Sequence, residues 1–125
     1  MELNFDPAAT AKVQPHLGPQ KQLLLTFEDG VGPYSQHAMI HMQIQFTLNV
    51  VAVDADISAY DTVIDSTLGP IRIKGYSSED LDPHLTIHLN PTANTMSLSG
   101  DSGIIDPNLG FIDFTTVGGP INPAR

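Results

Sequence analysis

Hydrophobic and polar positions alternate along residues 37–53. From Ala38 to Val50 every even position is apolar, whereas most of the odd positions carry His, Gln, Thr or Asn. A two-residue period puts successive side chains on opposite faces of a strand, and a helical period would scatter the apolar positions around the helix. The segment therefore predicts a long β-strand with one face in a core. After Val50 the apolar positions become odd, which predicts a β-bulge at residues 49–51.

Shorter alternating segments predict the other strands, and the segments between them are rich in the turn-forming residues Gly, Pro, Asp and Asn. The predicted strands are residues 22–28, 59–67, 71–76, 84–90, 95–99 and 110–117. No segment has a helical period. We therefore predict an all-β protein of about seven or eight strands, and we favour an antiparallel β-sandwich of jelly-roll or Greek-key type over a small closed β-barrel.

The chain divides into one domain and two ends. Residues 1–19 contain three prolines and no sustained period, which predicts an irregular N-terminal arm that docks on a neighbouring subunit or lies loose. Leu3 and Phe5 could still form a short edge strand. The all-β domain covers residues 20–117. Residues 118–125 are rich in Gly and Pro and predict a tail that cannot continue a strand ladder.

The charge of the chain excludes two classes of partner. Its formal net charge is −9, with 14 acidic against five basic residues, so it lacks the basic surface that nucleic acids and anionic membranes attract. Neutral ligands, cations, protein partners and a second copy in a homo-oligomer remain. The chain has no cysteine, which excludes disulfides and thiol chemistry. We favour an extracellular, periplasmic or virion location over a cytoplasmic one.

Four histidines lie in two segments with the same spacing, at His37 and His41 and at His84 and His88. If the two strands are antiparallel neighbours, the imidazoles face each other in pairs and could bind zinc, nickel or copper. Met39 lies on the same face and could add a soft ligand for copper(I). Without a metal, the imidazoles would gain charge between about pH 7 and pH 5 and make the face a pH-sensitive interface.

Two loops are acidic enough to be considered as calcium sites, because calcium prefers clustered oxygen ligands. Their spacing is not that of an EF-hand, and solvated loops are the commoner explanation. The candidate ligands are Asp54, Asp56, Asp61, Asp65, Glu79, Asp80 and Asp82.

A short polar segment matches two protease motifs. Gly100-Asp101-Ser102-Gly103 resembles the nucleophile segment of chymotrypsin-like serine proteases, and its last three residues resemble the catalytic triplet of retroviral-type aspartic proteases. The first family needs a double barrel, for which this chain is too short. In the second family the triplet follows apolar residues early in the chain. We interpret the segment as a turn.

The polar strand faces give the predicted function. We predict a non-enzymatic binding or assembly domain that contacts a protein partner or a second copy through these faces. The alternative is a small β-barrel enzyme or metal-binding protein that uses His37, His41, His84 and His88 as ligands or as acid–base groups. The residues of the predicted binding face are His37, Met39, His41, Gln43, Gln45, His84, Thr86 and His88.

Overall fold

The computed structural model describes residues 1–28 and 46–115. Its elements are β1 (Glu2–Phe5), α1 (Pro7–Val13), the 3₁₀ helix η1 (Gln14–His16), β2 (Lys21–Phe27), β3 (Phe46–Ala52), β4 (Thr62–Ser66), β5 (Ile71–Ile73), the 3₁₀ helix η2 (Gly75–Asp80), β6 (His84–Asn90), β7 (Thr95–Gly100) and β8 (Gly103–Asp113). None of the helices in this part of the chain is long and apolar enough to cross a membrane.

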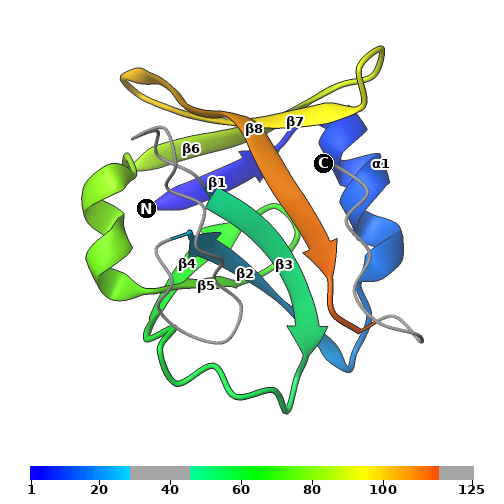
Figure 1. Cartoon of the computed structure of the whole chain (residues 1–125), viewed down its shortest axis with the longest axis vertical. Helices are drawn as coiled ribbons and strands as arrows, with labels where there is room; N and C mark the ends of the chain where they lie inside the picture. The colour runs from blue at the N-terminus through cyan, green and yellow to red at the C-terminus, as the bar shows by residue number, and fades with distance from the viewer. Residues whose placement is uncertain (29–45, 116–125) are drawn as a thin grey trace.

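The strands close into a barrel in the order β1-β4-β5-β2-β3-β8-β7-β6, and β6 bonds back to β1 (Figure 1). This confirms the all-β class and the closed-barrel alternative, whereas the favoured sandwich does not describe the molecule. A sandwich has two separate sheets with edges, and here each described strand has a neighbour on both sides.

Barrel closure depends on the N-terminal residues. Strand β1 lies parallel to both β4 and β6, with Glu2 opposite Asp65 on one side and His84 on the other. The side chains of Leu3 and Phe5 are buried in the core. The predicted irregular arm is therefore wrong, and the strand suggested by these two residues is a closing strand. Four residues are too few to show a period, which is why the sequence pattern missed its role.

Helix α1 follows β1 directly and begins with a strong local signal. The Oδ1 atom of Asp6 accepts a hydrogen bond of 2.7 Å from the backbone N–H of Ala9, and Pro7 occupies the first turn. Ala9 and Val13 then join the barrel core. With only seven residues, the helix is too short for its amphipathic pattern to stand out from a loop.

The sheet is mixed, so the predicted antiparallel arrangement is wrong. Strand β1 is parallel to β4 and β6, β2 is parallel to β5, and β3 is parallel to β8. The remaining pairs, β2–β3, β4–β5, β6–β7 and β7–β8, are antiparallel. Alternation of side chains reports which face of a strand is buried, but it carries no information on strand direction.

Apolar side chains from alternate strand positions fill the barrel interior. The even positions of β3 point into this core, as the sequence predicts. Among the members of the core are Leu23, Leu25, Phe46, Leu48, Val50, Ile71, Ile73, Leu85, Ile87, Met96, Leu98 and Phe111.

A second apolar cluster covers the outside of β2 and β3. It joins Leu24, Val51 and Tyr60, so these two strands are buried on both faces. The odd apolar positions at the end of β3 belong to this outer cluster. The register between β2 and β3 runs without a break, so the bulge predicted at residues 49–51 is wrong. Register shifts occur instead between β7 and β8.

Candidate functional site

Strand β6 displays its polar side chains on the outside of the barrel. Leu85 and Ile87 are fully buried, whereas His84 and His88 are exposed and Thr86 is half-buried between them. This alternation agrees with the sequence prediction for residues 84–90. Outward side chains on a closed barrel can meet solvent, a partner or an ion, so we describe the contacts of each histidine in turn.

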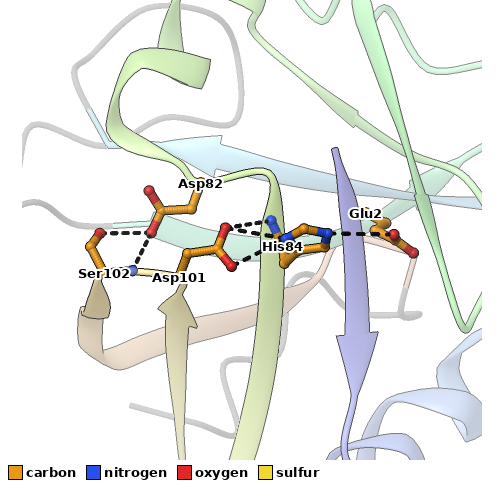
Figure 2. A network of polar contacts seen from close by, with 5 residues as sticks. All are labelled: Glu2, Asp82, His84, Asp101 and Ser102. Atoms are coloured by element: carbon orange, nitrogen blue, oxygen red, sulfur yellow. Dashed lines mark hydrogen bonds and ion pairs between the residues drawn. The ribbon is translucent and has the colours of Figure 1, made fainter.

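His84 connects three elements of the barrel (Figure 2). Its Nδ1 atom lies 3.1 Å from Oδ1 of Asp101, in the turn between β7 and β8, and its backbone N–H donates to Oδ2 of the same carboxylate at 3.1 Å. On the other side, its Nε2 atom lies 4.0 Å from Oε1 of Glu2 on β1. The imidazole is 68% exposed, so solvent screens both ion pairs.

Ser102 lies next to this network and binds a different carboxylate. Its Oγ atom donates to Oδ2 of Asp82 at 2.8 Å, and its backbone N–H donates to the same atom at 3.1 Å. The backbone and side-chain hydrogen bonds from Ser102 hold the pKa of Asp82 below its usual value. Figure 2 shows that Ser102 points to Asp82 and His84 to Asp101, so the serine hydroxyl and this imidazole do not contact each other. Asp101 and Ser102 form the predicted turn.

The two other described histidines also contact carboxylates, at separate places. His88 Nδ1 lies 3.4 Å from Oδ2 of Asp6, beside a hollow of about 320 Å³. His16 Nδ1 lies 2.7 Å from Oδ2 of Asp113, and its ring meets the ring of Phe111 edge-on at 5.0 Å. Burial alone would raise the pKa of Asp113, but hydrogen bonds from Thr115 and His16 outweigh it and lower the pKa.

The predicted histidine metal site is not formed by the residues that the structure describes, among which no three His, Asp or Glu side chains form a metal-binding group. His84 and His88 are four residues apart on a strand, or about 13 Å. Strand β6 lies between β1 and β7, whereas β3 lies between β2 and β8, so Phe46–Ala52 does not pair with β6. The predicted pairing of His37–His41 with His84–His88 involves residues outside the described part and stays a prediction. The remaining residues of the predicted face lie outside the described residues, and their roles stay predictions: His37, Met39, His41, Gln43 and Gln45.

In the acidic loops considered for calcium, aspartate carboxylates accept hydrogen bonds from backbone N–H groups. Asp61 accepts a hydrogen bond of 2.8 Å from the N–H of Gly75. Asp56 accepts one of 3.1 Å from the N–H of Ser58, and the hydrogen bonds from Ser58 lower its pKa. These contacts are those of ordinary turns. Within residues 46–115 the loops do not assemble a calcium site.

A buried polar layer under the outer cluster was missed by the sequence analysis. The Oγ1 atom of Thr26 lies 2.9 Å from the hydroxyl of Tyr60 and donates to Oδ1 of Asn49. Lys74 is fully buried, and its Nζ donates to the carbonyl of Phe27 at 2.9 Å. Lys74 continues an alternation in which charged residues are normally exposed, so the sequence carried no signal for its burial.

Fold and contacts together define a small closed β-barrel with a mixed sheet and isolated histidine–carboxylate pairs on its surface. Residues 1–113 match the model of a protein family described as iron–sulphur cluster biosynthesis, so the chain belongs to this family. No curated protein sequence matches the chain significantly.

Two solved structures have the same fold. One is a Lactobacillus salivarius protein, provisionally described as an Fe–S biosynthesis protein with a novel fold. It shares 33% sequence identity, covers 91% of this chain and 98% of its own, and superposes with a TM-score of 0.80. The other, a Lactobacillus acidophilus protein with the same provisional description, shares 23% identity over 90% of this chain and 89% of its own, with a TM-score of 0.68. At that identity it supports the fold alone.

The family assignment corrects the predicted function. A generic binding or assembly domain acting through a polar strand face is wrong, because the family model covers nearly the whole chain and concerns cluster biosynthesis. The alternative of a small β-barrel that works with a metal comes closer. Cysteine is the residue that would have suggested iron–sulphur chemistry, and the chain contains none.

Proposed function

We propose that this protein takes part in the assembly of iron–sulphur clusters, acting together with other proteins of that process. The match of residues 1–113 to the family model is the observation that carries the proposal. The L. salivarius protein supports it, because the similarity extends over 98% of that chain and is not confined to one motif.

The proposal includes a protein partner that binds the acidic surface around His84. Exposed carboxylates from two elements, Glu2 on β1 and Asp101 in the β7–β8 turn, lie on either side of His84. The net charge of −9 favours a partner with a basic surface, since opposite charges speed association and select orientation. In this proposal the carboxylates around His84 form the contact with the partner.

The role can be tested by deleting the gene in its host and measuring the activities of iron–sulphur enzymes, with a cluster-free enzyme as the reference. We expect the iron–sulphur activities to fall, most strongly under iron limitation, and to recover when the parent gene is restored. Unchanged iron–sulphur activities under both iron supplies would contradict the role.

Genes that encode charge-reversed variants, introduced into the same deletion strain, test the contact face. Glu2→Lys/Asp101→Lys should restore the activities only in part, because it reverses charge around His84. The matched control Asp54→Lys/Asp56→Lys changes the charge equally in an exposed loop after β3 and should restore them fully. Equal recovery with both variants would contradict the proposed face and leave the role itself standing.

A further inference from the structure

The donor atoms of this chain do not fit an iron–sulphur cluster. Clusters of the [2Fe–2S] and [4Fe–4S] types are normally held by four cysteine thiolates, and in Rieske centres two histidines replace two of them. None of the 125 residues is a cysteine. Even the substitution known from Rieske centres would leave half of the ligands missing.

The described imidazoles do not converge either. His84, His88 and His16 each contact a carboxylate, and their partners are Asp101, Asp6 and Asp113 respectively. A cluster needs its ligands around one point, whereas these three pairs lie at different places on the barrel. The one described sulfur inside the core, the thioether of Met96, is fully buried among apolar side chains.

Two hollows on the described surface offer too few ligands. The hollow of about 320 Å³ beside His88 has one imidazole and one carboxylate, from Asp6, as metal donors. A hollow of about 180 Å³ between β1 and β4 has only the carboxylates of Glu2 and Asp65. The barrel interior is filled by apolar side chains.

We infer that this member of the family acts in cluster biosynthesis without holding a cluster itself, so that the cluster stays on a partner protein as the substrate of the process. The inference rests on the proposed function, which supplies the role in cluster assembly. It depends on two observations. No residue of the whole chain is a cysteine, and the His, Asp and Glu side chains of the described part do not gather into a metal-binding group.

Anaerobic reconstitution tests the inference directly. The full chain is incubated with ferrous iron, sulfide and a reductant and then desalted, while a four-cysteine apo-ferredoxin is treated in parallel as the positive control. We expect iron and acid-labile sulfide at background in this protein, no sulfide-to-iron charge-transfer absorption and an unchanged circular dichroism spectrum. Retention of iron and sulfide near one cluster per chain or per dimer, with that absorption, would overturn the inference.

The two tests can fail independently. Loss of iron–sulphur enzyme activity on gene deletion, together with no retained cluster, supports both the role and the inference. A retained cluster overturns the inference and leaves the role intact. Absence of any effect of gene deletion contradicts the role, whereas the reconstitution result still decides whether this chain holds a cluster.

Discussion

The outer faces of β3 and β6 come from similar alternating sequences and lie in opposite environments. On β6 the outward residues His84 and His88 are exposed, whereas on β3 the outward residues Thr47 and Asn49 are fully buried. Both strands nevertheless point alternate apolar residues into the same core. Alternation therefore identifies the inner face of a strand, but it does not reveal what the outer face meets.

The difference arises from the chain that follows each strand. After β3 the chain returns over the outside of β2 and β3, and Tyr60 packs there on Leu24 and Val51. After β6 a tight loop leads straight into β7, so nothing from that connection covers the outward side chains. A layer brought in by a loop is a tertiary effect that local patterns cannot encode.

The largest expected effect comes from removing the outer layer at its centre. Tyr60→Ala should lower the free energy of unfolding by about 3–5 kcal/mol, because it leaves a cavity and breaks the hydrogen bond to Thr26. The exposed counterpart His84→Ala should change it by less than about 1 kcal/mol. Urea unfolding followed by circular dichroism measures both. Similar losses for the two variants would contradict the contrast between the faces.

The predictable part of the fold is the part that depends on neighbours in sequence. Strand β6 has the bounds predicted from its alternation, and β2 differs by one residue at each end. Barrel closure was not predictable, because it depends on Glu2 and Leu3 pairing with residues more than 60 positions away in β4. The parallel pairs were hidden for the same reason.

The candidate site also has a part that the sequence predicts and a part that it does not. That His84 and His88 point outward follows from the pattern of β6, but their partners do not. Asp101 and Glu2 come from other elements, and a single sequence without an alignment cannot show that they meet His84. Family membership was equally hidden, since it is carried by similarity along residues 1–113 and not by a local motif.

Carboxylates give an intermediate effect that depends on pH. The pKa of Asp113 is lowered in the folded state. Its contribution to the free energy of unfolding is therefore fully present above the unfolded pKa of about 3.9 and is lost as the pH falls through the lower folded pKa. Asp113→Asn should therefore destabilise by about 1–3 kcal/mol at neutral pH and flatten the acid side of the stability profile.

Asp82 provides the more exposed comparison, because its pKa is also lowered but its hydrogen bonds to Ser102 lie at the surface. Asp82→Asn should flatten the acid side less than Asp113→Asn does. Urea midpoints measured from neutral to acid pH give both profiles. A larger change for Asp82→Asn would show that burial of the carboxylate does not decide the effect.

The smallest effect is expected inside the buried polar layer. Asn49 accepts a hydrogen bond from Thr26, but its Nδ2 group has no hydrogen-bond partner among the described residues. Asn49→Leu should change the free energy of unfolding by less than about 1 kcal/mol, since the lost hydrogen bond is offset by removal of a buried unpaired donor. Thr26→Val should cost more, because the amide oxygen of Asn49 then loses its donor and stays buried beside an Nδ2 group that already lacks a partner among the described residues. If Asn49→Leu proves the more costly of the two in urea unfolding, the amide stabilises the layer through more than its bond to Thr26.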